Sequence, residues 1–261
     1  MARTDWAEAA LLLAGHGLAD HPDGALGTMR HAESLRARGL FADVRVGFLR
    51  QEPELAAVLA ALTQPRVYVV PMLASKGYIA DVVMAGRLNL AGPATRRIAG
   101  GREQELCFCD PVGTHPDIPA LLGRLIIAEC HRRELAPEAT DVILVGHGTP
   151  RNPRSSSRTR EVADALSKSG VAGRVQAMFL EEDPLIDGWK DSTTAGNVIV
   201  APFLFGNWYH ASEDLPRRIG PPVAGRQIWY LKPLGEEPEI ANLALAMVER
   251  FETGRGCGQL T

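Results

Sequence analysis

The feature of this sequence that most restricts its fold is an internal repeat. The motif Gly15-His16-Gly17 returns 131 positions later as Gly146-His147-Gly148. Phe48-Leu49 returns at the same offset as Phe179-Leu180. One register kept over more than fifty residues indicates a duplicated structural unit. Further matches in this register are Pro22 with Pro153, Leu35 with Leu166, Gly39 with Gly170, Pro53 with Pro184, Val67 with Val198, Val69 with Val200, and Pro71 with Pro202.

Each copy predicts alternating strands and helices. The short apolar runs 9–14 and 141–145 end at a glycine and are typical of strands that are buried on both faces. Gly39 and Gly170 end helical patterns and are placed as C-terminal caps. Alternation with short connections predicts parallel sheets with right-handed crossovers. We therefore expect an α/β protein of two similar lobes, each with a four-stranded parallel sheet flanked by helices.

The repeat also predicts where the two lobes end. We expect an N-terminal lobe over 1–134, a C-terminal lobe over 141–252 and a flexible glycine-rich tail over 253–261. The alignment of the copies shifts by nine positions where Pro116 pairs with Pro238, which indicates a deletion in the second copy. Cys257, in the tail, is assigned no role.

Composition excludes several classes of protein. The 261 residues are 46% hydrophobic, enough for a substantial core, and the net charge of −3 gives no overall attraction to nucleic acid or anionic membranes. No apolar run is long enough to span a bilayer, and the first eight residues are too polar for an export signal, so we expect a cytoplasmic protein. Cys107 and Cys109 alternate within an apolar segment, which favours a structural role over a metal site.

Three polar side chains of the second copy follow successive predicted strands. His147 follows the first strand, Glu181 the second, and His210 lies a few residues past the third. Ligands of open parallel sheets bind outside the carboxyl ends of the strands, so we expect these side chains to share one crevice. Two imidazoles and a carboxylate suit a borderline divalent metal such as cobalt, nickel, iron or zinc. Each residue alone has an ordinary structural explanation, but their joint placement favours a metal site.

The first copy keeps only part of this set. His16 is present, but Arg50 stands at the position of Glu181 and Ile79 at the position of His210. An arginine and an isoleucine do not bind a metal ion. We expect the first lobe to shape the far wall of a cleft, and the role of His16 is left open.

These motifs resemble the class II chelatases. Gly-His-Gly after a strand, Phe-Leu-Glu at 179–181, and Ala-Pro-Phe-Leu at 201–204 followed by His-x-x-x-Asp-Leu-Pro at 210–216 are similar to the sirohydrochlorin chelatases. The resemblance covers roughly residues 9–250 and implies a two-lobed fold with the active-site cleft between the lobes. It places His147, Glu181 and His210 at the metal-site positions of the family. The segment between Phe-Leu-Glu and the next proline is one residue shorter than is usual there, so Glu182 is the alternative carboxylate.

The resemblance implies insertion of a divalent metal into sirohydrochlorin, with cobalt expected before ferrous iron. The metal is a substrate, and no further cofactor is expected. His147 and His210 would hold the ion or accept pyrrole protons, and Glu181 would offset positive charge and help to remove protons. A monomer and a homodimer are both compatible with two lobes in one chain. The carboxylates of the tetrapyrrole require donors, which we expect from Arg151, Arg154, Ser155 and Ser156.

Three alternatives remain open from the sequence. The first is a non-catalytic metal- or tetrapyrrole-binding relative, because one copy has already lost part of its site. The second is a periplasmic-type metal-binding protein, which the absence of an export signal disfavours. The third is a phosphate-transfer enzyme that uses His16 or His147, disfavoured because no glycine-rich phosphate loop follows either turn.

Overall fold

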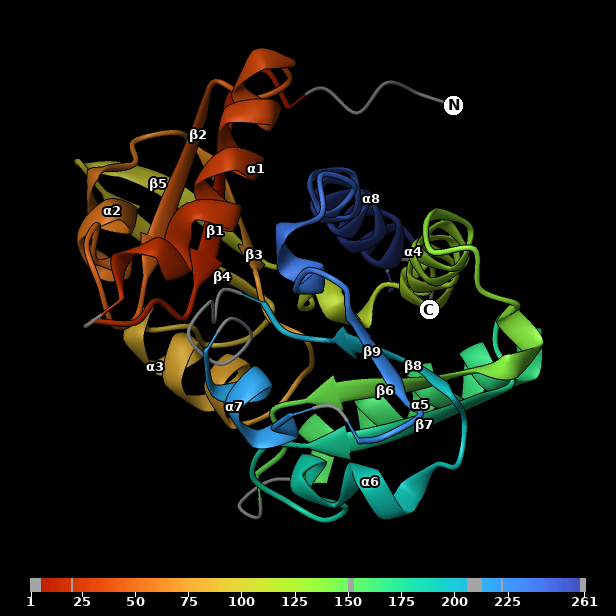
Figure 1. Ribbon diagram of the computed structural model, residues 1–261. Helices are drawn as coiled ribbons and strands as arrows, with labels where there is room; N and C mark the ends of the chain where they lie inside the picture. The colour runs from red at the N-terminus through yellow and green to blue at the C-terminus, as the bar shows by residue number, and fades with distance from the viewer. Residues whose placement is uncertain (1–5, 20, 150–152, 206–212, 222, 259–261) are drawn as a thin grey trace. The chain divides into compact units, whose positions relative to one another are not determined.

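The computed structural model consists of two compact α/β units (Figure 1). It describes residues 6–19, 21–149, 153–205, 213–221 and 223–258. The first unit comprises Met1–His115 together with Pro238–Thr261, and the second comprises Pro116–Glu237. Within the described ranges, every helix is too short or too polar to cross a membrane.

The sheet of the first unit has five strands in the order β2-β1-β3-β5-β4. Its parallel part contains β1 (Ala9–Gly15), β2 (Asp43–Phe48), β3 (Arg66–Pro71) and β5 (Arg102–Phe108). The prediction of four parallel strands is wrong for this unit, because β4 (Ala94–Ala99) adds an antiparallel edge strand.

The additional strand escaped the sequence pattern for a physical reason. It forms a hairpin with β5, and most of its side chains are exposed or half-buried, so it lacks the apolar run of a buried strand. Gly100 and Gly101 make the turn with φ of 56° and 77°, a conformation that favours glycine. The nine-residue shift between the copies falls where this hairpin lies in the first unit.

The sheet of the second unit has the four parallel strands that the sequence predicted, in the order β7-β6-β8-β9. The strands are β6 (Thr140–Gly146), β7 (Arg174–Phe179), β8 (Asn197–Pro202) and β9 (Gln227–Tyr230). In both units the first strand of the copy lies between the second and the third, so three successive strand ends meet at one edge.

Helices flank each sheet, and the last helix of each copy belongs to the compact unit of the other copy. The last helix of each copy, α4 (Ile118–Arg132) or α8 (Ile240–Gly258), groups with the unit that contains the other copy's sheet. The compact units therefore differ from the lobes 1–134 and 141–252, which follow the repeat. Residues 253–258, expected as a tail, continue α8. The other α-helices among the described residues are α1 (Leu26–Ala37), α2 (Leu55–Ala61), α3 (Ala85–Arg87), α5 (Pro153–Ser169), α6 (Trp189–Ser192) and α7 (Leu215–Ile219).

A buried tyrosine anchors α8 on the first sheet. The Tyr68 hydroxyl, on a fully buried side chain of β3, donates a hydrogen bond of 2.7 Å to Glu252 Oε1 of α8. Burial raises the pKa of this phenol, which keeps it a donor. Phe251 packs edge-on against the same ring, and Trp6 and Phe41 complete the aromatic cluster. This cluster explains why α8 belongs to the first unit.

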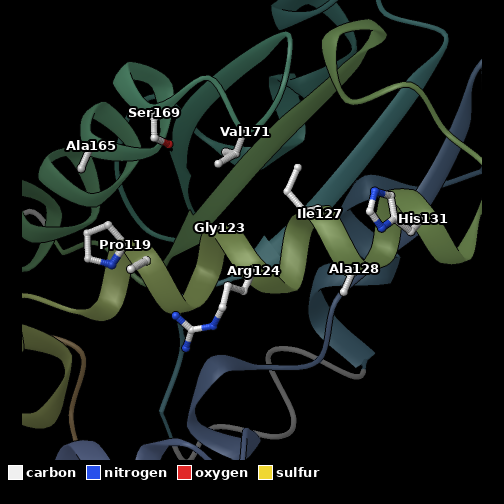
Figure 2. A pocket seen from close by; sticks show the side chains of 10 residues that line it. Pro119, Gly123, Arg124, Ile127, Ala128, His131, Ala165, Ser169 and Val171 are labelled. Atoms are coloured by element: carbon white, nitrogen blue, oxygen red, sulfur yellow. The ribbon is translucent and has the colours of Figure 1, made fainter.

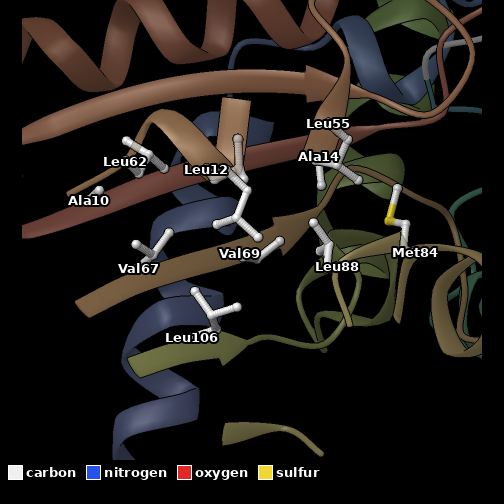
Figure 3. Close-up of a cluster of buried hydrophobic side chains, with 11 residues drawn as sticks. Ala10, Leu12, Ala14, Leu55, Leu62, Val67, Val69, Met84, Leu88 and Leu106 are labelled. Atoms are coloured by element: carbon white, nitrogen blue, oxygen red, sulfur yellow. The ribbon is translucent and has the colours of Figure 1, made fainter. Parts of the chain in front are cut away.

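The buried apolar cluster of the first unit (Figure 3) has equivalent side chains in the second unit. The register of 131 continues past the third strands, because the buried residues Met84 and Leu88 correspond to Leu215 and Ile219. Burial of each such side chain stabilises the fold by roughly 1.5–3 kcal/mol. The pairs nearer the strands are Leu12 with Ile143, Leu55 with Ile186, Val67 with Val198, and Val69 with Val200.

Candidate metal centre

His147 lies in a tight turn at the carboxyl end of β6, and both flanking glycines are required there. A Cβ at Gly146 would lie 2.5 Å from Thr159 Oγ1, and one at Gly148 would lie 2.7 Å from Glu182 Cγ. Gly148 also has a φ of 69°, which disfavours any other residue. The turn therefore holds the histidine at the strand end because its neighbours have no side chains.

The hydrogen bond of His147 determines which ring nitrogen carries the proton. Its Nδ1 lies 2.8 Å from the carbonyl oxygen of Gly148. A carbonyl only accepts, so Nδ1 carries a proton, and the lone pair of the neutral ring is on Nε2. The side chain is 37% exposed, which makes the ring accessible to an incoming ion.

Glu181 lies directly beside this histidine. Its backbone N–H donates to the carbonyl oxygen of His147 at 2.9 Å, which joins the end of β7 to the turn after β6. Its carboxylate Oε2 lies 3.8 Å from His147 Nδ1, and the side chain is 54% exposed. The structure thus brings together two of the three residues that the sequence predicted as metal ligands.

Glu182, the alternative carboxylate, forms hydrogen bonds with other residues of the second unit. One carboxylate oxygen accepts the backbone N–H of Thr149 at 2.8 Å, and the other accepts Arg160 Nη2 at 3.3 Å. At the equivalent position of the first unit, Gln51 Oε1 accepts the backbone N–H of Leu18 at 2.9 Å. A neutral amide therefore accepts the equivalent backbone hydrogen bond in the other copy, which favours a structural role for Glu182.

The negative charge of Glu182 is paired with the positive charge of Arg160. This guanidinium also lies over the Phe179 ring at 4.6 Å and donates to the backbone carbonyl of Asp183 at 2.9 Å. In the first copy Met29 stands at the position of Arg160, where Gln51 replaces the glutamate. The second copy therefore has a charged pair at this turn, where the first copy has two uncharged residues.

Arg218 of α7 is a supporting residue that the sequence reasoning missed. Its Nη1 donates to the carbonyl oxygen of Leu180 at 2.5 Å, and its Nε donates to Asp187 Oδ2 at 3.0 Å. The Leu180–Glu181 peptide is consequently held on one side by Arg218 and on the other by His147. The repeat contained a signal for this residue, because Arg87 precedes Arg218 by 131 positions.

The ion pair of Arg218 also has a pH dependence. The hydrogen bond from Arg218 holds the pKa of the Asp187 carboxyl below its ordinary value. A lowered folded-state pKa means that the pair stabilises the fold above the unfolded pKa of about 3.9. This stabilisation is lost as the pH falls through the folded-state pKa.

Replacing Arg218 with alanine is expected to loosen the strand end that carries Glu181. The change leaves the Leu180 carbonyl without its charged donor, which costs about 1–3 kcal/mol of stability. We expect the affinity for Co²⁺ to fall roughly 10–100-fold, as for other residues that orient metal ligands. Urea unfolding and Co²⁺ titration measure the two effects.

Arg87 provides the matched control for this experiment. Its side chain is 49% exposed and pairs with Glu54 at 3.0 Å, so Arg87→Ala is expected to change stability by no more than about 1 kcal/mol. An Arg218→Ala variant that binds Co²⁺ as tightly as Arg87→Ala would show that Arg218 does not position the site.

The remaining predicted site residues are only partly visible. His210 and Arg151 lie outside the described residues, as do the side chains of Arg154 and Ser155. Ser156 is buried in α5 with 5% exposure, which argues against direct contact with a substrate. Within the described part of the chain no three His, Cys, Asp or Glu side chains form a metal-binding group. His147 and Glu181 are two of the three predicted ligands, and the third, His210, falls in the undescribed segment.

The cysteines confirm the structural interpretation. Cys107, Cys109 and Cys130 are all buried and not in disulfides. Burial raises the pKa of the Cys109 thiol well above its usual range, which disfavours the thiolate that a metal requires. Cys107 and Cys109 are therefore core residues of the first unit.

The first unit repeats the turn without the carboxylate. His16 Nδ1 lies 2.9 Å from the carbonyl oxygen of Gly17, and the backbone N–H of Arg50 donates to the His16 carbonyl at 2.9 Å. The backbone thus matches that of the second unit, with a cationic side chain where Glu181 lies in the other copy. A positive charge at this strand end disfavours a metal ion there, as expected for the degenerate copy.

A groove of about 620 Å³ lies elsewhere in the second unit, between α4 and α5 (Figure 2). Its walls include Gly123 and Ile127 of α4, together with Val171. None of its lining residues is a predicted site residue, so the groove is separate from the candidate metal centre.

Comparisons with known proteins agree on one family. The family model described as CbiX matches residues 10–128 and 141–251. A probable sirohydrochlorin cobaltochelatase from Halobacterium salinarum is 31% identical over an alignment that covers 90% of this chain and 89% of that protein.

Solved structures share the fold. A multi-domain protein from Deinococcus radiodurans with structural similarity to chelatases matches with a TM-score of 0.71 and 28% identity. The match covers 92% of this chain but only 54% of that protein, so this chain spans about half of its length. A CbiX structure, from the terminal enzyme of siroheme biosynthesis in denitrifying bacteria, matches with a TM-score of 0.69 and 20% identity over 93% of this chain and 98% of that one.

Proposed function

This chain belongs to the CbiX family, and we propose that it inserts a divalent metal ion into sirohydrochlorin. The observation that carries the proposal is the pairing of His147 and Glu181 at adjacent strand ends. The relative that aligns over nine-tenths of the chain is named for the same reaction. The fold shared with chelatases of known structure supports the same conclusion.

The metal substrate would bind between His147 and Glu181. His147 offers its Nε2 lone pair, and the exposed carboxylate of Glu181 supplies an oxygen ligand and a negative charge. His210, from its place in the sequence, would add a second imidazole. Few protein ligands and an exposed site suit an ion that must leave again, because a closed set of four ligands would retain it.

Insertion releases two pyrrole protons for each metal ion that enters the ring, and the same side chains can accept them. When the ion passes from His147 to the pyrrole nitrogens, the Nε2 lone pair becomes available for one proton. The Glu181 carboxylate can accept the other. The two groups together thus exchange one divalent ion for two protons, which keeps the local charge nearly constant during transfer.

The finer assignments belong to the same proposal. We place cobalt before ferrous iron, although the two ions accept overlapping ligands. Arg151 and Arg154 would bind carboxylates of the tetrapyrrole. No resident cofactor is required, and we propose a cytosolic protein that acts as a monomer or a homodimer.

An absorbance assay tests the proposed function. The protein is incubated with metal-free sirohydrochlorin and Co²⁺ or Fe²⁺ under anaerobic conditions, and the change in the tetrapyrrole spectrum is followed. We expect a rate that rises in proportion to protein concentration and exceeds the spontaneous rate. If the protein binds metal or tetrapyrrole but insertion proceeds only at the spontaneous rate, the chain is a non-catalytic relative.

A further inference from the structure

The groove between α4 and α5 of the second unit combines an apolar wall with a cationic edge (Figure 2). Gly123, Ile127 and Val171 belong to the apolar wall, and Ile127 extends from α4 toward Val171. Arg124 and His131 are exposed on α4 and are the only ionisable side chains among the residues that line the groove. The volume of about 620 Å³ lies within the range of small-molecule pockets, roughly 300–1,000 Å³.

The charge of Arg124 is available to a ligand. Among the described residues, no carboxylate lies within ion-pair distance of its guanidinium. The Glu129 carboxylate of the same helix is buried and pairs with Arg132 and Arg133, at 2.6 and 3.1 Å. A guanidinium group offers parallel N–H donors that suit a carboxylate or another oxyanion. An anionic group at the edge of the groove would therefore find an unused partner.

The first copy of the repeat has a larger side chain at the corresponding point of its last helix. The helices α4 and α8 align at an offset of 122, and the fully buried Ile126 corresponds to the fully buried Val248. In this alignment Leu245 of α8 stands at the position of Gly123. A glycine inside a helix lowers its stability, and here it leaves the wall of the groove without a side chain.

A second difference between the copies concerns a polar link between helices. In the first unit, Arg38 Nη2 donates to Asn242 Oδ1 at 2.7 Å, which joins the end of α1 to α8. The corresponding residues of the second copy are Ser169 and Ala120, which both line the groove and are too short to form this link. The second copy therefore lacks two features that cover the equivalent surface of the first.

We propose that the groove between α4 and α5 binds a small amphipathic anion. The apolar body of the ligand packs on Ile127 and Val171, and its anionic group pairs with Arg124. The inference does not rest on the proposed function, because none of the lining residues belongs to the candidate metal centre.

The test measures binding of two fluorescent probes to the full chain. One is the anion 8-anilinonaphthalene-1-sulfonate, and the other is N-phenyl-1-naphthylamine, which has the same apolar body without the sulfonate. We expect saturable binding of one sulfonate probe per chain. Arg124→Ala is expected to raise the dissociation constant of the sulfonate probe about fivefold and to leave that of the neutral probe unchanged.

A double variant tests the groove itself. Ala120→Asn combined with Ser169→Arg restores the residues that link α1 to α8 in the first copy, and both positions are exposed, so the fold is expected to be retained. This variant is expected to weaken both probes at least about tenfold, because the link covers the apolar wall. The matched control is Lys168→Ala, which removes an exposed cation of α5 that does not line the groove and should bind both probes like the wild type.

Three results would overturn the inference. The first is an Arg124→Ala variant that binds the sulfonate probe like the wild type or loses both probes equally. The second is a double variant that binds both probes like the wild type. The third comes from sedimentation equilibrium, where a dimer that only the double variant dissociates would assign the groove to a second copy of the chain.

Discussion

Replacing His147 with alanine is expected to abolish metal insertion, whereas the same replacement of His16 is expected to leave it almost unchanged. Both histidines lie in the same glycine-flanked turn and both bond through Nδ1 to the next carbonyl oxygen, at 2.8 and 2.9 Å. Glu181 places a carboxylate 3.8 Å from the His147 ring, whereas Arg50 stands at the corresponding position of the first copy. Loss of a group that binds the ion and accepts a proton is expected to reduce kcat at least about 100-fold.

The pair of variants contains its own control for folding. Each change removes one equivalent hydrogen bond, which is worth about 0.5–1.5 kcal/mol, so urea unfolding should change by similar amounts in both. His210→Ala is expected to be as damaging to insertion as His147→Ala. If His16→Ala were the inactive variant, the reaction would belong to the first copy of the repeat.

The second large effect is an expected difference in activity between variants of two adjacent carboxylates, Glu181 and Glu182. Glu181→Gln removes the negative charge beside His147 and is expected to lower kcat at least about 100-fold. Glu182→Gln is expected to keep activity within a few-fold of the wild type. The glutamine can still accept the backbone N–H of Thr149, as Gln51 accepts that of Leu18 in the first copy.

Initial rates and unfolding together decide between these two residues. Glu182→Gln weakens the pair with Arg160, whose side chain is 44% exposed, so a loss of no more than about 1 kcal/mol is expected. An inactive Glu182→Gln with an active Glu181→Gln would identify Glu182 as the functional carboxylate.

Much of the fold followed from the repeat because its strands are buried on both faces. Such strands are continuous apolar runs, and matching two copies fixed the register from Gly15 with Gly146 to Pro71 with Pro202. The edge strand β4 has mainly exposed or half-buried side chains and therefore left no such run. The exchange of α4 and α8 between the units was equally hidden, because helical periodicity shows which face is apolar but not which sheet covers it.

The candidate site was predictable to the extent that it depends on strand ends. His147 and Glu181 follow directly from where the apolar runs stop. The separate roles of Glu181 and Glu182 depend on the directions of adjacent side chains and on Arg160, which the sequence does not display. Arg218 was missed because its bond to Leu180 joins residues 38 positions apart.

We expect this chain to have one metal site, in the second copy of the repeat. X-ray diffraction from cobalt-soaked crystals, recorded at the cobalt absorption edge, tests it directly. A single anomalous peak is expected about 2.0–2.2 Å from His147 Nε2 and from a carboxylate oxygen of Glu181. A peak at His16, or one held by Glu182 in place of Glu181, would contradict the account.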